Sequence, residues 1–130
     1  MTRPLRVLVV EDEVLIADYI AISLADAGHE VVGIFDCADP ALSLLREAKP
    51  DVVILDIRIN GDVDGVDLAL RMQAEGLTTK HLFITGSGDP ETKARALATG
   101  PIAFLQKPVT VRQLEAILAT VAGTPSGAPS

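Results

Sequence analysis

Cysteine and aromatic residues are scarce in this chain of 130 residues, which contains one cysteine, no tryptophan and 3% aromatic residues. The single cysteine, Cys37, excludes an intramolecular disulfide and a cluster of thiolate metal ligands, so we expect a reducing, cytoplasmic setting. Hydrophobic residues make up 48% of the sequence, and with so few aromatics among them the core must consist of Val, Ile, Leu and Ala. This composition is typical of a globular domain.

Long hydrophobic runs and an excess of positive charge are also absent. The N-terminal segment MTRPLRVLVVEDE has only four consecutive apolar residues between Arg6 and Glu11, too few for a signal peptide or a membrane span. The formal charge of −7, from 18 acidic against 11 basic residues, opposes nonspecific binding to nucleic acid or to an anionic membrane. We therefore expect no nucleic acid and no membrane as a partner.

The chain shows no internal repeat, and its length suits one domain whose core needs no disulfide or structural metal. The C-terminal segment GTPSGAPS contains no apolar side chain larger than Ala or Pro. We expect one domain over residues 1–122 and a flexible tail over residues 123–130, with no DNA-binding or catalytic output domain.

Short, uninterrupted runs rich in Val and Ile alternate with longer segments of helical spacing, which is typical of βα units around a parallel sheet buried on both faces. The strands are expected at residues 5–10, 31–35, 52–55, 82–85 and 102–105, with a helix after each. Five such units, (βα)5, predict an α/β fold in which a doubly wound five-stranded parallel sheet forms the middle layer of a three-layer sandwich.

Capping residues predict where several helices begin. Asp39–Pro40 and Asp89–Pro90 each suit an N-cap followed by a proline in the first helical turn. Asp64 precedes another helix, and Thr110 with Gln113 forms a capping box at the start of the last one.

Polar side chains stand at the carboxyl ends of the predicted strands, where ligand sites form in sheets of this kind. Glu11 and Asp12 follow the first strand, Asp56 follows the third, Thr85 ends the fourth and Lys107 follows the fifth. Each residue alone has an ordinary structural explanation, such as a helix-dipole contact or a turn. In the strand order 2-1-3-4-5 they all meet at one edge of the sheet, which favours a functional site.

Three carboxylates within about 4 Å of one another repel by several kcal/mol at an effective dielectric constant near 20, so raised pKa values or a bound cation must offset the repulsion. Oxygen ligands without Cys or His favour Mg²⁺. Such an ion, beside a lysine and a hydroxyl, neutralises the charge of a transferring phosphoryl group. Asp56 would then be the nucleophile that forms an aspartyl phosphate.

The motifs VVEDE, VVILDIR, FITG and FLQKP follow in an order and spacing that resemble the receiver domains of two-component response regulators, from about residue 5 to residue 121. The resemblance implies a flavodoxin-like fold and a role in phosphorelay signal transduction. A histidine kinase or a histidine phosphotransfer protein would supply the phosphoryl group in a Mg²⁺-dependent reaction. The chain would be a stoichiometric phosphoacceptor with slow self-dephosphorylation rather than an enzyme, and an unknown downstream protein would bind the fourth helix, fifth strand and fifth helix.

The resemblance also implies a role for each residue at the acidic edge. Asp56 matches the phosphoacceptor, and the Mg²⁺ ligands would be Asp12, Asp56 and the backbone carbonyl of Arg58, with Glu11 acting mainly through water. Arg58 and Ser87 would lie beside the phosphoryl position and set the rate of hydrolysis.

Four further matches concern phosphoryl binding and switching. Lys107 would pair with a phosphoryl oxygen, and the peptide bond from Lys107 to Pro108 is expected to be cis, which proline permits. Thr85 matches the switch hydroxyl that turns toward the phosphoryl group, and Phe104 matches the aromatic residue whose rotamer follows that movement.

Three features depart from the usual receiver pattern. Ile59–Asn60 replaces a common Met-Pro pair, and Asp64 lies eight rather than seven residues beyond the phosphoacceptor, so this loop carries one extra residue. Phe104 lacks the hydroxyl of the commoner tyrosine. Gly86 stands where alanine is frequent, which predicts a looser switch loop.

Other site types fit less well. Asn60, Asp62 and Asp64 match the first half of an EF-hand calcium loop, but the twelfth position, where glutamate should bind the ion, is Arg71. A phosphatase of the haloacid dehalogenase type needs a second aspartate at the position of Arg58. A nucleotide-binding flavodoxin-like module needs a Gly- or Ser-rich loop where this chain has VVEDE.

A further alternative keeps the fold and changes the function. A receiver-like interaction module can signal without phosphorylation, although such modules usually lose an acid or the lysine, and this chain retains all of them. His29 and His81 fall at no motif position, and we expect them at the surface or at loop edges rather than in phosphotransfer.

Overall fold

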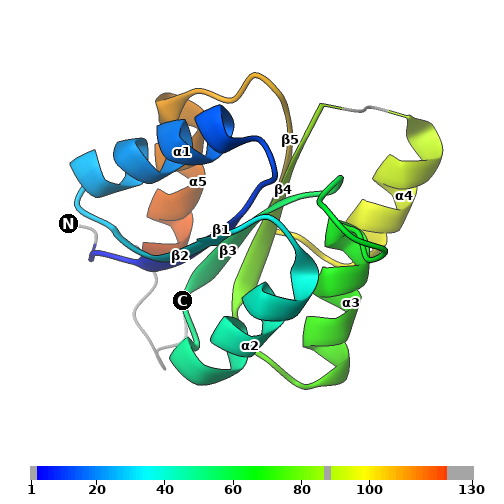
Figure 1. Ribbon diagram of the computed structural model, residues 1–130. Coiled ribbons are helices and arrows are strands. Elements are labelled where there is room, and N and C mark those ends of the chain that lie inside the picture. The colour runs from blue at the N-terminus through cyan, green and yellow to red at the C-terminus, as the bar shows by residue number, and fades with distance from the viewer. Residues whose placement is uncertain (1–2, 87–88, 123–130) are drawn as a thin grey trace.

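The computed structural model describes residues 3–86 and 89–122 and consists of five strands that alternate with five helices along the chain (Figure 1). In chain order the elements are β1 (Arg6–Val10), α1 (Val14–Asp26), β2 (Glu30–Phe35), α2 (Ala38–Ala48), β3 (Val52–Asp56), α3 (Gly65–Ala74), β4 (Lys80–Thr85), α4 (Pro90–Ala98), β5 (Ala103–Gln106) and α5 (Val111–Ala122). The predicted tail over residues 123–130 and Ser87 lie outside the described residues.

All pairings in the sheet are parallel, and the strand order is β2-β1-β3-β4-β5. Helices α1 and α5 cover one face of the sheet, while α2, α3 and α4 cover the other (Figure 1). The (βα)5 three-layer sandwich predicted from the hydrophobic pattern is therefore confirmed. Reversal of the strand order between β1 and β3 leaves an opening at the carboxyl edge of the sheet, where a site can form.

Two hydrophobic cores lie on the two faces, because alternate residues of each central strand point to opposite sides. Leu8 and Val10 of β1 belong to the core under α2 and α3, whereas Val7 and Val9 belong to the core under α1 and α5. All four side chains are fully buried. Covered on both faces, the central strands require the uninterrupted apolar runs seen in the sequence.

Most of the predicted helix caps are confirmed by hydrogen bonds. The Asp64 side chain accepts from the backbone N–H of Asp67 at 2.8 Å, and the Asp67 side chain accepts in turn from the Asp64 N–H, which completes a capping box. Asp89 accepts from the N–H of Thr92, with Pro90 at the first helical position. Thr110 and Gln113 exchange the predicted pair of hydrogen bonds at the start of α5.

The predicted start of α2 is wrong. The N-cap is Cys37 rather than Asp39, and the Cys37 side chain makes no capping hydrogen bond. A β-bridge to Asn60 holds Cys37 in an extended conformation, so the helix begins at Ala38, directly after the bridge. Pro40 is accommodated because the first backbone N–H groups of a helix have no partner within the helix.

The expected surface position of His81 is also wrong. This side chain is 7% exposed and lies on β4, next to α3 residues and to Thr99 at the end of α4. Its Nε2 is 2.9 Å from the Thr99 hydroxyl, and its ring meets Phe83 edge-on at 5.4 Å between centroids. Because the Thr99 hydroxyl donates its proton to the Ala96 carbonyl, it accepts a hydrogen bond from His81 Nε2. Burial lowers the pKa of His81. His81 therefore belongs to the packing of α4.

Candidate functional site

The register of the sheet brings two buried carboxylates together at its carboxyl edge. Val10, the last residue of β1, lies opposite Leu55 of β3, so Glu11 emerges beside Asp56. Glu11 is 2% exposed and Asp56 is 3% exposed. Asp12 and the exposed Glu13 continue the chain from Glu11, and ligand oxygens of these four acids lie within 4.8 Å of one another.

A single ammonium group links three of these acids. Lys107 Nζ lies 2.8 Å from Asp56 Oδ2, 2.8 Å from Glu11 Oε1 and 3.4 Å from Glu13 Oε1. The lysine follows β5, and its backbone N–H donates to the carbonyl of Thr85 at 2.8 Å, which joins the ends of β4 and β5. The Lys107–Pro108 peptide bond is cis, as predicted.

The crowding of charge shifts two pKa values in the site. Burial raises the pKa of Glu11 to about 7; the neighbouring Asp56 adds to the rise, and Lys107 opposes it. Burial would lower the pKa of Lys107, but the carboxylates of Asp56 and Glu11 outweigh it and raise that pKa overall. Lys107 is therefore charged at neutral pH, whereas Glu11 is only partly ionised there.

The site has features that suit a hard divalent cation. Glu11 Oε1 is buried, and the Lys107 ammonium at 2.8 Å, which Asp56 shares, is its charged partner. One ammonium leaves the site with more negative than positive charge, and a bound cation would offset the excess. The ligand atoms that Glu11, Asp12 and Asp56 offer are carboxylate oxygens, as Mg²⁺ prefers. The residues present therefore fit the magnesium ion predicted from the sequence.

An open cavity of about 500 Å³ gives access to the acidic cluster. Arg58 and Thr85, both predicted site residues, reach it from the ends of β3 and β4. The Arg58 backbone N–H donates to Asp56 Oδ1 at 3.3 Å, and Thr85 is 1% exposed. The lining residues are Asp12, Glu13, Asp56, Arg58, Thr85, Gly86 and Lys107.

Phe104 lies on β5, away from this cavity. It pairs with Phe83 in the sheet, with ring centroids 6.4 Å apart, and the Nζ of Lys93 on α4 stands 5.7 Å from the Phe104 ring centroid. The structure therefore brings five of the predicted residues to the cavity, with Glu11 joined to them through Lys107, and leaves Phe104 on the α4 side of the sheet.

The loop with the extra residue is fixed at both ends. The backbone N–H of Asn60 donates to the carbonyl of Asp36 at 2.9 Å, and Gly65 donates to Ile57 at 2.7 Å. Gly65 packs so closely that an added Cβ would overlap the carbonyl oxygen of Asp56. The capping role of Asp64 also occupies the carboxylate that a calcium loop would need.

Sequence reasoning missed Glu13 as a member of the cluster. Glu13 is the third acid of VVEDE, and that run of acids was the available signal. The strand-end rule considers only the residues directly after a strand, and Glu13 stands three residues after β1. The side chain nevertheless reaches back to Lys107.

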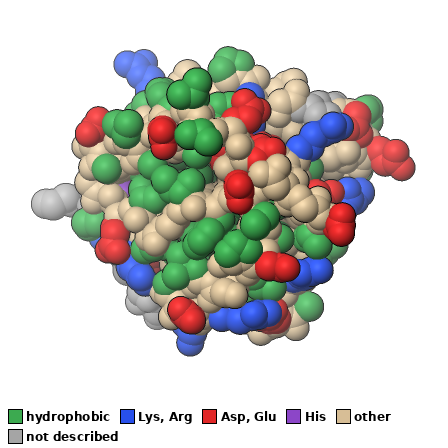
Figure 2. Space-filling model, in the orientation of Figure 1, with side chains coloured by type: hydrophobic (Ala, Val, Ile, Leu, Met, Phe, Trp, Pro, Cys, Tyr) green, Lys and Arg blue, Asp and Glu red, His purple; other side chains and the backbone are tan. Residues whose placement is uncertain are grey.

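An apolar groove of about 660 Å³ adjoins the acidic cavity and shares Glu13 and Lys107 with it. Leu15, Ile16 and Tyr19 of α1 form one wall, and the segment from Pro108 to Thr110 forms the other. Figure 2 shows hydrophobic side chains at the surface over α1, at the upper left, among acidic ones. Leu15 is 84% exposed and Ile22 is 62% exposed, so α1 is apolar on its outer face as well as on its buried one.

Within the described residues, no helix has the length and apolarity needed to cross a membrane. The family model described as response regulator receiver domain matches residues 7–119. Among similar proteins, the two-component response regulator PhoP of Pseudomonas aeruginosa is 31% identical over 95% of this chain and 54% of its own length. The phosphate regulon transcriptional regulatory protein PhoB of the same organism is 31% identical over 88% of this chain and 50% of its own. The chain thus spans about half the length of these relatives.

Solved structures agree with the sequence matches. The signal receiver domain of a modulated diguanylate cyclase from Desulfovibrio desulfuricans G20 is 35% identical, with a TM-score of 0.86 over 93% of this chain and 95% of that one. The signal receiver domain of the putative response regulator NarL from Mycobacterium tuberculosis is 31% identical, with a TM-score of 0.84 over 94% and 99% of the two chains. On its matched motifs, fold and acidic edge, this chain belongs to the receiver domain family of two-component response regulators.

Proposed function

We propose that Asp56 accepts a phosphoryl group and that the modified domain signals through a changed protein-binding surface. The observation that carries the proposal is the position of the Asp56 carboxylate. It is almost fully buried, bonded at 2.8 Å to Lys107, and still lines a cavity open to solvent. A donor can therefore reach the carboxylate, while neighbouring groups are already placed to receive the charge it brings.

In the proposed reaction, an oxygen of Asp56 attacks the phosphorus of the donor. The new P–O bond forms as the bond from phosphorus to the leaving group breaks, and the electron pair departs with the leaving group. Lys107, charged and 2.8 Å from Asp56, offers its ammonium to an oxygen of the transferred group. Asp12, Asp56 and the backbone carbonyl of Arg58 would hold Mg²⁺, with Glu11 acting mainly through water, and the ion would supply the remaining positive charge when bound.

The donor in this proposal is a histidine kinase or a histidine phosphotransfer protein. The apolar groove along α1 supports a protein donor because it opens into the reactive cavity at Glu13 and Lys107. Hydrophobic side chains of the donor would occupy the groove and place its phosphohistidine opposite Asp56. A second, downstream protein would recognise the surface of α4, β5 and α5.

Switching in this proposal is a two-state equilibrium that phosphorylation shifts. The Thr85 hydroxyl would turn toward the phosphoryl group, and Phe104 would move toward the space that Thr85 leaves. In the present conformation Phe104 packs between Phe83 and the ammonium of Lys93. Its movement would therefore change the contact between β5 and α4.

Intact-mass spectrometry after incubation with acetyl phosphate tests the proposal. We expect a gain of one phosphoryl group in the wild type that requires Mg²⁺ and is absent in Asp56→Asn. Asp18→Asn, which removes an exposed carboxylate of α1 that does not line the reactive cavity, is the matched control and should label normally. If Asp56→Asn still labels stoichiometrically, the acceptor is another residue. If the wild type neither labels nor binds beryllofluoride with Mg²⁺, the domain signals without phosphorylation.

A further inference from the structure

Glu13 occupies a position where glutamate is a poor structural choice. It is the N-cap of α1, a position that favours Ser, Thr, Asp or Asn because their short side chains can bond the first free N–H groups of the helix. The Glu13 side chain makes no such capping bond. Helix capping therefore does not explain a glutamate here.

The Glu13 side chain instead extends over the reactive cavity. Its Oε1 lies 3.4 Å from Lys107 Nζ although the side chain is 62% exposed, and it forms the boundary between the acidic cavity and the apolar groove. Lys107 is the ammonium that must pair with an incoming phosphoryl oxygen, so Glu13 and the phosphoryl group compete for it. Within the described chain, the other cation lining the cavity, Arg58, makes no ion pair with the four acids.

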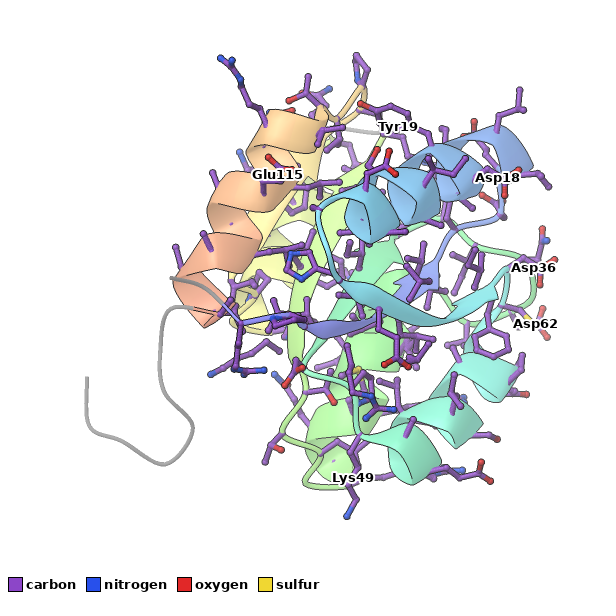
Figure 3. All side chains as sticks on the ribbon, turned by 90° about the vertical axis from the view of Figure 1, so that its left-hand side faces the viewer. Asp18, Tyr19, Asp36, Lys49, Asp62 and Glu115 are labelled. Carbon is purple, nitrogen blue, oxygen red and sulfur yellow. The ribbon has the colours of Figure 1, made fainter. Side chains whose placement is uncertain are left out.

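Glu13 differs in position from the other exposed acids of this part of the chain. Asp18, Asp36 and Asp62, labelled in Figure 3, come from α1 and from the loops after β2 and β3, and none of them lines the reactive cavity. A phosphoryl donor must approach past carboxylates, of which Glu13 is the exposed one at the cavity mouth. The repulsion grows with the negative charge of the donor, since Coulomb energy is proportional to the product of the charges.

We propose that Glu13 is a specificity-determining residue that slows phosphoryl donors according to their negative charge and so favours a nitrogen leaving group, such as imidazole, over an acyl phosphate. The inference rests on the proposed role of Asp56 as acceptor. Glu13, the fourth acid of the cluster, would thus select the phosphoryl donor, whereas the other three acids would serve the metal ion and accept the phosphoryl group.

Two small donors of different charge separate this effect from a general change in reactivity. Acetyl phosphate is a dianion at neutral pH: Asp56 attacks phosphorus, the P–O bond to the acetyl group breaks, and acetate leaves with the electron pair. Phosphoramidate is a monoanion that carries its proton on nitrogen: the P–N bond breaks and neutral ammonia leaves with the electron pair. Neither transfer needs another reactant, and both give the same phosphorylated Asp56.

The experiment measures the initial rate of labelling by each donor, with Mg²⁺ at low ionic strength, in wild type and Glu13→Gln. Two unit charges about 5–6 Å apart in water repel enough to change a rate about threefold to fourfold. With the Glu13 carboxylate at that distance from the donor, its removal should raise the rate by this factor for each unit of donor charge. We therefore expect the acetyl phosphate rate to rise about tenfold, and the ratio of the acetyl phosphate rate to the phosphoramidate rate to rise about threefold to fourfold. Near 1 M salt the change in this ratio should nearly disappear, because an exposed charge is screened.

Two control variants complete the design. Glu13→Asp keeps the charge and should retain a rate ratio closer to that of the wild type than Glu13→Gln does, while Asp18→Asn removes a charge from the same helix outside the cavity and should leave the ratio unchanged. Equal acceleration with both donors, or no acceleration, in Glu13→Gln would overturn the role of Glu13 while leaving the proposed function standing. Failure of both donors to label both wild type and Glu13→Gln would overturn the proposed function together with this inference.

Discussion

The protonation of Glu11 makes the stability of the metal-free domain depend on pH in an unusual direction. The pKa of this carboxyl is raised from 4.5 to about 7, mainly by burial. Between these values the folded protein holds a proton that the unfolded chain releases. The free energy of unfolding therefore falls as pH rises from about 4.5 to 7, which is the opposite of the usual behaviour of an ion-paired carboxylate.

The size of the effect follows from the shift in pKa. Each pKa unit corresponds to about 1.4 kcal/mol, so Glu11 lowers the stability by about 3 kcal/mol at most by pH 8. Glu11→Gln cannot titrate and should lack this loss. The variant also loses the contact with Lys107. Because that lysine stays charged across the whole pH range, the loss changes the free energy of unfolding by a constant amount. Part of the loss has already occurred at pH 5, so relative to the wild type the variant should gain about 2–3 kcal/mol between pH 5 and pH 8.

Other titrating groups cancel in this comparison. Burial lowers the pKa of His81, so its neutral form in the folded protein costs stability as pH falls below about 6.5. This opposite slope is present in wild type and in Glu11→Gln alike. Urea denaturation followed by circular dichroism at pH 5, 6, 7 and 8 with a chelator gives the difference directly. A difference between the two proteins that is constant across these pH values would refute the burial argument for Glu11.

Three further predictions follow from single contacts. Gly65→Ala should lower the free energy of unfolding by about 2–4 kcal/mol, because its Cβ would overlap the last carbonyl of β3; Gly86→Ala, whose Cβ would stand 3.9 Å from its nearest neighbour, should cost less than about 1 kcal/mol in the same urea titration. Lys107→Ala should label slowly with acetyl phosphate, and labelling should not shift the NMR signals of the Phe104 ring. A phosphorylation-dependent shift of that ring in the variant would contradict the role of Lys107 in switching. Lys93→Met should tighten beryllofluoride binding about twofold to fivefold, since it removes a cation–π contact worth about 0.5–1 kcal/mol that holds Phe104 in place; unchanged affinity would show that the contact does not bias the switch.

The order of the elements was predictable because it depends on local signals. Uninterrupted apolar runs mark strands covered on both faces, and Asp64, Asp89 and Thr110 cap their helices through bonds to residues three positions later. The convergence of Glu11 and Asp56 follows once the strand order is known, since parallel neighbours end at the same edge.

Features fixed by contacts between distant segments could not be predicted in this way. The start of α2 depends on a bridge between Cys37 and Asn60, residues that no local pattern relates. His81 is buried because α3 and Thr99, at the end of α4, lie against the start of β4, although histidine itself does not indicate burial. Glu13 joins the site through a lysine 94 positions further along the chain.

The two apolar faces of α1 contribute unequally to folding, and under the proposed function the outer face serves recognition. Ile20 and Leu24 face the core and are almost fully buried, whereas Leu15 and Ile22 remain largely in water and contribute little to the stability of the domain. Substitutions on the outer face can therefore accumulate without unfolding the protein, and each one alters the surface that a partner meets. A duplicated copy of this domain could acquire a new partner by changing a few exposed residues of one helix, while its core and its reactive edge stay the same.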